Sequence, residues 1–223
     1  MLSLIYKDLV LQKKVILFAA GYGGFLFIAF NNIIFKEFVY NMGTIAISYV
    51  ILMTAANNDE KNKTDIILNS LPIHRVKLVL EKYLLAYVSV FLGLSIMTVL
   101  GGIMKVSGVV AVSRLANIND LLFSLSSVLL LSSLYFPLFL KFGSKYTRVI
   151  NLFFFLGLFF LPSWLTGFIM NNVNQKSGIV QDLINYFTSI PLWSVGVGLL
   201  VITLVLNMIS YLVSVQIYRH KEF

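Results

Sequence analysis

No cysteine occurs anywhere in the sequence, and histidine occurs only twice, at His74 and His220. The absence of cysteine excludes disulfide bonds, thiolate metal ligands and a cysteine nucleophile. The sequence also contains no HExxH zinc motif, no G-x-x-x-x-G-K-S/T phosphate loop and no G-x-S-x-G nucleophile motif. We therefore expect no catalytic residues, no metal site and no bound cofactor in this chain.

Charged residues are scarce as well, at 12% of the 223 residues against 59% hydrophobic residues. Soluble domains average roughly a quarter charged residues, so this composition indicates a membrane protein. Six apolar runs are long enough to cross about 30 Å of hydrocarbon as helices of about 20 residues. Because the runs are continuous rather than alternating, they favour an all-α transmembrane domain over residues 1–223 and not a β-barrel. The predicted spans are Val15–Phe35, Phe38–Ala56, Leu78–Met104, Leu121–Leu140, Val149–Met170 and Leu192–Tyr218.

The basic residues are distributed unevenly between the two sides that these spans define. If both termini share one side, that side receives 13 of the 17 Lys and Arg residues and the other side receives four. The positive-inside rule then predicts a multi-pass protein with both termini in the cytoplasm. The net charge of +8 is a topology signal and a contact for anionic lipid headgroups, and we expect no nucleic-acid partner.

Two segments outside the spans show helical amphipathicity, which is typical of helices lying along a membrane surface. We expect residues 1–14 to form a cytoplasmic elbow helix and residues 171–191 to form an extracellular amphipathic element that ends at Pro191. Ordinary loop flanks with an anchoring role are the alternative for both. The apolar positions are Leu2, Ile5, Tyr6, Leu9 and Val10 in the first segment and Val180, Leu183, Ile184 and Phe187 in the second.

The predicted spans carry no ionisable residue near the middle of the membrane, because Glu81 and Lys82 fall at a cytoplasmic end. Proton-coupled carriers need such groups, so we do not expect this chain to use a proton gradient by itself. Hydroxyl and amide side chains inside the spans either bond between helices or line a pathway. The small residues Ala20 and Gly24 permit a close helix crossing. The candidate pathway residues are Ser124, Ser127, Asn151 and Asn207.

The segment Asn58–Tyr83, NDEKNKTDIILNSLPIHRVKLVLEKY, holds nine of the chain's 26 Asp, Glu, Lys and Arg residues. A tight connection needs about 2–8 residues, whereas about twenty separate the second and third spans. Thr64 and Asp65 are candidate caps for a short helix that would contain an apolar triplet, and Pro72 suits the first turn of the next helix. The segment is therefore either a helix that docks a soluble partner or a solvated loop with topology-setting lysines.

The same segment resembles the second cytoplasmic segment of the type-two ABC export permeases. In that family an acidic and basic stretch leads to "SLP", a basic residue, a valine and a Lys-Tyr or similar pair. The layout of the whole chain is also similar, most of all to the small firmicute permeases that include the phenol-soluble modulin exporter subunits. The matching residues here are Asp59, Glu60, Lys61, Ser70, Leu71, Pro72, Arg75, Val79, Lys82 and Tyr83.

This resemblance implies a permease subunit of the bacterial cell membrane without enzymatic activity of its own. It would pair with a second permease chain, identical or paralogous, and with a cytoplasmic ATPase dimer that binds ATP and Mg. The expected cargo is an amphipathic peptide or a lipid-like molecule, since the spans offer apolar, aromatic and hydroxyl side chains. A membrane anchor or sensor that recruits a cytoplasmic partner without transport is the alternative. The implied ATPase-coupling residues are Asp59, Glu60, Lys61, Lys63, Asp65, Ile66, Ile67, Leu68, Ser70, Leu71, Pro72 and Arg75.

Overall fold

The computed structural model describes residues 2–29, 38–62, 74–108, 114–143 and 191–220. Every regular element in these ranges is a helix, which confirms the all-α class. The predicted span Val149–Met170 and the predicted element 171–191 lie almost wholly outside the described residues. The helices are α1 (Leu2–Leu11), α2 (Lys13–Ala29), α3 (Val39–Lys61), α5 (Arg75–Ser107), the Ile118–Gly143 helix and α8 (Leu192–Arg219).

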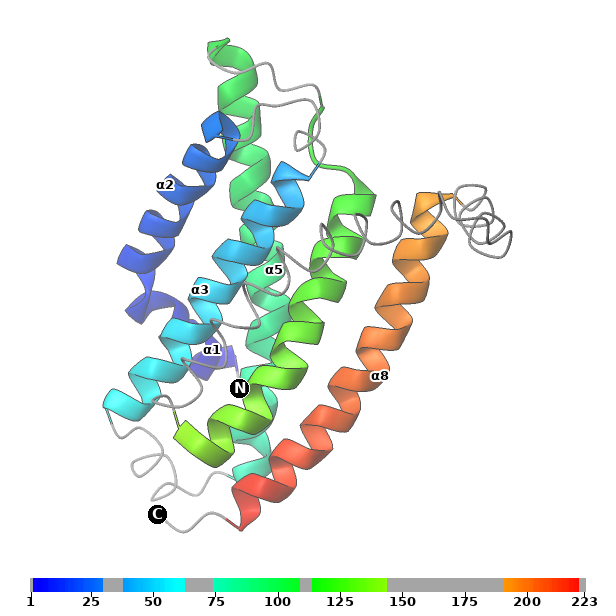
Figure 1. Cartoon of the computed structure of the whole chain (residues 1–223). Helices are drawn as coiled ribbons and strands as arrows, with labels where there is room; N and C mark the ends of the chain where they lie inside the picture. The colour runs from blue at the N-terminus through cyan, green and yellow to red at the C-terminus, as the bar shows by residue number, and fades with distance from the viewer. Residues whose placement is uncertain (1, 30–37, 63–73, 109–113, 144–190, 221–223) are drawn as a thin grey trace, which may run out of the picture.

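The long helices form a bundle in which chain direction alternates from α2 through α3 and α5 to the Ile118–Gly143 helix (Figure 1). Helix α8 runs in the same direction as the Ile118–Gly143 helix, so both end at the lower end of the view. Four of the described helices are long and apolar enough to cross a membrane, and α1 with α2 makes a fifth if the bent pair counts as one span. The protein is therefore a multi-pass membrane protein.

Helices α1 and α2 meet at Gln12 with a bend of 68°. Residues 1–14 therefore contain a separate short helix, but its side chains do not share one apolar face as the sequence suggested. Ile5 is buried in the bundle, whereas Tyr6 and Val10 are exposed. The helix is rotated in this way because Asp8, which is 3% exposed, points inward towards charged partners.

Helices α3 and α5 pack most closely, and glycine makes this approach possible. A Cβ atom on Gly93 would lie 3.1 Å from the backbone oxygen of Thr44, so the two backbones nearly touch there. Met97 fills the space beside Gly23 and Gly43, whereas Gly24 has no neighbour closer than 3.9 Å to its Cβ position. No helix crosses closely at Gly24 within the described residues, where Gly23, Gly43 and Gly93 make the close contacts instead.

At the upper end of the bundle, one polar cluster fastens the start of the Ile118–Gly143 helix to α3. The Arg114 guanidinium bonds both carboxylate oxygens of Asp120 at 2.5 and 3.0 Å. The Tyr40 hydroxyl donates to the Arg114 carbonyl at 3.0 Å. Asp120 also accepts the backbone N–H of Asn117 at 2.8 Å, which is one of the two bonds of a capping box, while the Asn117 side chain accepts the N–H of Ile118 at 2.7 Å. Asn117-x-x-Asp120 before an apolar run is the sequence signal for this helix start.

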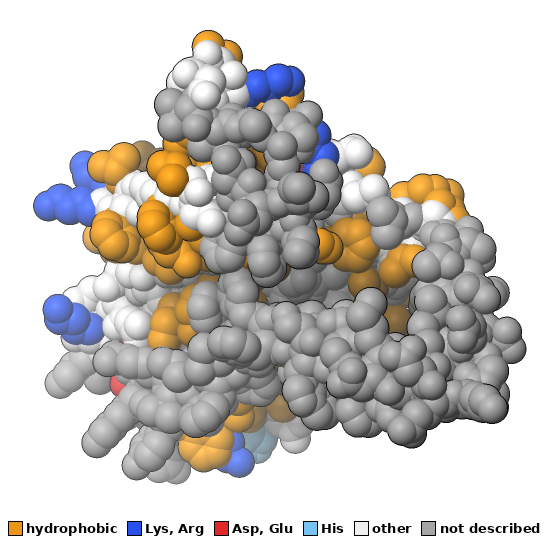
Figure 2. Space-filling model, turned by 45° about the horizontal axis from the view of Figure 1, so that its top comes forward, with side chains coloured by type: hydrophobic (Ala, Val, Ile, Leu, Met, Phe, Trp, Pro, Cys, Tyr) orange, Lys and Arg blue, Asp and Glu red, His pale blue; other side chains and the backbone are white. Residues whose placement is uncertain are grey.

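Most of the outer surface of the described helices is apolar. Figure 2 shows hydrophobic side chains over much of the visible described surface, with Lys and Arg in a few separate groups. Of the four candidate spans, α8 is the least buried, and its outer face is apolar around the exposed Met208. Such a surface suits contact with lipid tails or with another membrane-embedded chain.

Replacing Gly93 with leucine will separate α3 from α5, because the new side chain would have to displace the Thr44 backbone. Overpacking of this kind typically costs about 1–3 kcal/mol. Gly102 is the matched control, since it lies on the same helix and has nothing within 4 Å of its Cβ position. In detergent, Gly93→Leu should lower the melting temperature clearly while Gly102→Leu leaves it unchanged or raises it. Equal melting temperatures for the two variants would contradict this packing.

Candidate functional site

The structure describes only the two ends of the predicted coupling segment 57–77. Residues 57–61 continue α3, whose C-cap Asn62 donates its backbone N–H to the Asn58 carbonyl at 3.0 Å. Arg75 is the first residue of α5. The predicted coupling residues that lie outside the described residues are Lys63, Asp65, Ile66, Ile67, Leu68, Ser70, Leu71 and Pro72.

The three coupling residues in the last turn of α3 point in different directions. Glu60 and Lys61 are exposed, as a docking surface requires. Asp59 is 5% exposed and turns into the bundle, where it forms an ion pair with Lys82 of α5. The resemblance placed Asp59 among residues that meet a partner, but the structure places it in an internal contact beside that surface.

The Asp59–Lys82 pair is the centre of a larger ionic cluster. Lys7 of α1 lies 3.5 Å from the second Asp59 oxygen and 3.0 Å from Asp8. Lys82 lies 3.9 Å from the neighbouring Glu81 carboxylate. This ionic cluster of Lys7, Asp8, Asp59, Glu81 and Lys82 joins α1 to both helices that flank residues 62–74. Sequence reasoning gave Asp8 no role, although it is the only acidic residue before Glu37.

A further contact brings the end of α8 to the same place. Arg75 donates from Nη1 to the backbone carbonyl of Arg219 at 3.0 Å. Glu60 lies near Gly143, the last residue of the Ile118–Gly143 helix. The described helix ends at the lower end of the bundle therefore converge around the two ends of the predicted coupling segment.

A seam of hydrogen bonds holds α8 against the rest of the bundle. The Asn207 amide donates to the Leu129 carbonyl at 3.3 Å and to the Ser132 hydroxyl at 3.0 Å. Its oxygen accepts from Tyr87 at 3.5 Å, so both ends of the amide have protein partners. Asn207, predicted as a candidate pathway residue, thus serves as an interhelical contact in this structure.

Two tyrosine and serine contacts extend this seam towards the lower end. The Tyr83 hydroxyl lies 2.6 Å from the Ser210 hydroxyl and 2.8 Å from the Ser214 hydroxyl. Ser210 also approaches the Ser133 carbonyl at 2.5 Å. Since Asn207, Ser210 and Ser214 recur at helical spacing, one face of α8 is polar and bonded while the opposite face is apolar.

The other candidate pathway residues have local partners or are not described. Ser124 donates to the Asp120 carbonyl at 2.5 Å and Ser127 to the Phe123 carbonyl at 2.8 Å. These are bonds to the preceding turn of the same helix, as expected for serine in an apolar helix. Asn151 lies outside the described residues.

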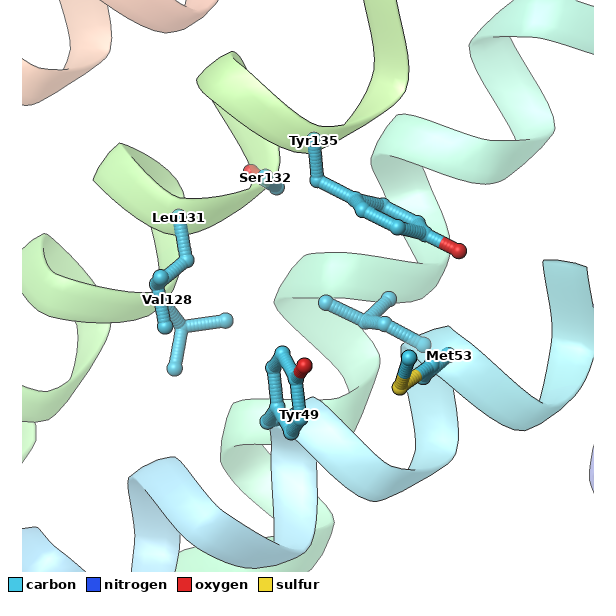
Figure 3. Close-up of a pocket in the computed structure, with 7 residues that line it drawn as sticks. Tyr49, Met53, Val128, Leu131, Ser132 and Tyr135 are labelled. Atoms are coloured by element: carbon cyan, nitrogen blue, oxygen red, sulfur yellow. The ribbon is translucent and has the colours of Figure 1, made fainter. Parts of the chain in front are cut away.

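A small, mainly apolar pocket lies between α3 and the Ile118–Gly143 helix (Figure 3). The side chains of Tyr49 and Tyr135 project into it from the two helices. Ser132 links the pocket to the α8 seam, because its hydroxyl also accepts the Asn207 amide. The lining residues are Tyr49, Leu52, Met53, Val128, Leu131, Ser132 and Tyr135.

Removing the Asp59 charge will destabilise the bundle, because it leaves Lys82 charged in a largely buried position. Breaking a buried ion pair in this way costs about 3–5 kcal/mol. We expect Asp59→Asn to lower the melting temperature in detergent and the double exchange Asp59→Lys with Lys82→Asp to recover part of the loss. Lys14→Gln is the control, since Lys14 is exposed at the same end. No recovery in the double exchange would argue against a direct pairing.

Replacing Asn207 with leucine will loosen α8, because three hydrogen-bonded groups lose their partner. Interhelical hydrogen bonds in membranes contribute about 0.6 kcal/mol each, so a loss of about 1–2 kcal/mol is expected. Met208→Leu changes the adjacent, exposed position and should have no effect. Thermal unfolding of the two variants in detergent measures the difference. If Asn207→Leu and Met208→Leu had the same melting temperature, the Asn207 hydrogen bonds would not stabilise the packing of α8.

The comparison with protein families gives a match over residues 3–219 to the family described as ABC-2 family transporter protein. No curated protein and no solved structure matches the chain. The family match covers nearly the whole sequence and agrees with the membrane-spanning helices described above. The chain therefore belongs to the ABC-2 family of transporter proteins and is a transmembrane subunit of an ABC transporter.

Proposed function

We propose that this chain couples ATP hydrolysis by a separate cytoplasmic ATPase to the export of an amphipathic peptide or lipid-like molecule. The observation that carries this proposal is the family match, which extends over residues 3–219 and so includes the whole segment 57–77. ATP and Mg would bind to the partner ATPase, and this chain would supply no catalytic group.

The arrangement of helix ends supports a coupling role for segment 57–77. Helix α3 ends at Lys61 and α5 begins at Arg75, both within the segment. The ion pair between Asp59 and Lys82 holds the two helices together. Lys7 adds α1 to the same contact. A push on the segment would therefore move three helices as one body, which is the mechanical requirement for coupling. The coupling surface would comprise the exposed Glu60 and Lys61 together with the predicted residues from Lys63 to Arg75.

Six spans and a cytoplasmic lower end are part of the proposal. The Ile118–Gly143 helix and α8 run in the same direction, so an odd number of crossings separates them if each one spans the membrane. One crossing there, added to the four described spans and the bent α1–α2 pair, gives six. By the positive-inside rule the lower end faces the cytoplasm, because the basic residues of α1, those at the start of α5 and those at the ends of α3 and α8 lie there.

We infer pairing with a second permease chain from the apolar outer faces of the bundle, and the cargo class from the types of side chain in the spans. The outer faces of α2 and α8 are apolar, and either could contact another membrane-embedded chain. The spans offer apolar, aromatic and hydroxyl side chains, which suit an amphipathic molecule better than an ion. This cargo class is also the one implied by the likeness to the phenol-soluble modulin exporter subunits.

The proposal is tested by co-purification and ATPase measurement. The tagged chain should capture an ATPase, and Ile67→Asp should abolish both capture and the permease-dependent part of hydrolysis, because it places a charge on an apolar docking side chain. Ile67→Val keeps the apolar character and should retain both. Whole-cell efflux of a fluorescent amphipathic peptide then separates an exporter from the alternative, a membrane anchor or sensor. Capture and hydrolysis that are unchanged in Ile67→Asp would count against coupling through this segment.

A further inference from the structure

Helices α1 and α5 bring two carboxyl groups together inside the ionic cluster. Asp8 and Glu81 are 3% and 4% exposed, and each carboxyl group neighbours the other. Asp8 Oδ2 and Glu81 Oε1 are both buried and have no hydrogen-bond partner among the described residues. Two buried acceptors in neighbouring carboxyl groups are costly without a donor, since an unsatisfied polar group in an apolar setting typically loses more than a hydrogen bond provides.

The lysines of the cluster do not supply the missing donors. Asp59 takes the closest contact of Lys82 and a second contact from Lys7. Lys7 reaches one Asp8 oxygen at 3.0 Å, but Lys82 stays 3.9 Å from Glu81, which is beyond hydrogen-bond distance. Of the five groups in the cluster three are acidic and two are basic, and the amino group of Met1 also acts electrostatically on the Glu81 carboxyl.

We propose that Asp8 and Glu81 share one proton and so form a carboxylic acid–carboxylate pair between α1 and α5. A single proton turns one acid into a donor and satisfies the second carboxylate. An ionised carboxylate can only accept hydrogen bonds, so no rotation of the two side chains achieves this without the proton.

A bound metal cation could bridge the two carboxylates as well, but the geometry favours the proton. Within the described ranges, no group of three or more His, Asp or Glu side chains is arranged to hold a metal ion. Two carboxyl groups alone provide too few oxygen ligands for the six to eight that Ca²⁺ prefers, whereas they are sufficient for one shared proton.

The pair makes the docking of α1 dependent on pH. When pH rises until the shared proton leaves, the two neighbouring carboxylates repel each other and weaken the contact between α1 and α5. Lys7 still links α1 to Asp59 of α3. If segment 57–77 couples to an ATPase, as proposed above, proton loss would loosen one of the three helices that move with it. That last consequence rests on the proposed function, whereas the shared proton does not.

Infrared spectroscopy tests the proton directly. The full chain in a maltoside detergent, which has no ester carbonyls, should show the C=O band of a buried protonated carboxylic acid at neutral pH. Asp8→Asn and Glu81→Gln should each abolish the band. Glu60→Gln removes an exposed carboxylate in the same region and should keep it. Absence of the band in the wild-type protein between pH 5 and pH 8 (roughly the range in which the fold should hold), or its survival in both variants, would overturn the proposal.

A distance measurement tests the consequence for α1. The absence of native cysteine allows spin labels at Val10→Cys and Lys77→Cys, two exposed positions on α1 and α5, without removing background thiols. Raising the pH should broaden the distance distribution and lengthen its mean. Glu81→Gln, whose amide donates at every pH, should keep the short distance throughout. A distribution that is independent of pH in the wild type, or equally dependent on pH in Glu81→Gln, would contradict a protonated link. Neither readout requires transport or an ATPase, so failure here is distinct from failure of the proposed function.

Discussion

The buried ion pair between Asp59 and Lys82 is the constraint on which the lower end of the molecule depends. Neither charge can be left alone in that setting without a large desolvation penalty, so α3 and α5 must end and begin side by side. The segment between α3 and α5 therefore leaves the bundle at Lys61 and returns to it at Arg75, and the ion pair holds these two helix ends close together. Lys7 extends this constraint to α1, and Arg75 extends it to the end of α8.

Above this cluster, shape and hydrogen bonds determine which helices meet. In a membrane, apolar surface gives little preference between lipid and protein, so helix association needs close backbone contact or bonded polar groups. Gly93 provides the first for α3 and α5, and Asn207 with Ser210 provides the second for α8. At the upper end, Arg114 and Asp120 close the bundle with a second ion pair. The α3–α5 pair is thus fixed by charge at its lower end and by packing in its middle, which makes the pair a stiff unit suited to transmit a push.

The sequence was sufficient for the features that depend on composition and local pattern. Continuous apolar runs fixed the all-α membrane class, and four predicted spans correspond to described helices whose ends differ by a few residues. The motif from Asp59 to Tyr83 indicated the transporter family that the family match shows. Serines in the fourth span bond to carbonyls of their own helix, as their residue type predicts. The predicted span Val149–Met170, and the predicted role of Asn151 within it, remain expectations of the sequence.

Only the tertiary structure decided which polar residues face inward and which partners they meet. A pattern of charges along the chain gave Asp59 a place in a docking segment, but its partner Lys82 lies 23 positions away on the next described helix. Nothing local distinguishes Asp8 from a surface carboxylate, or Gly93 from Gly24, because each role depends on what a second helix places opposite it. Sequence periodicity fixes the faces of one helix, whereas pairing between helices is decided by desolvation and steric fit across distant segments.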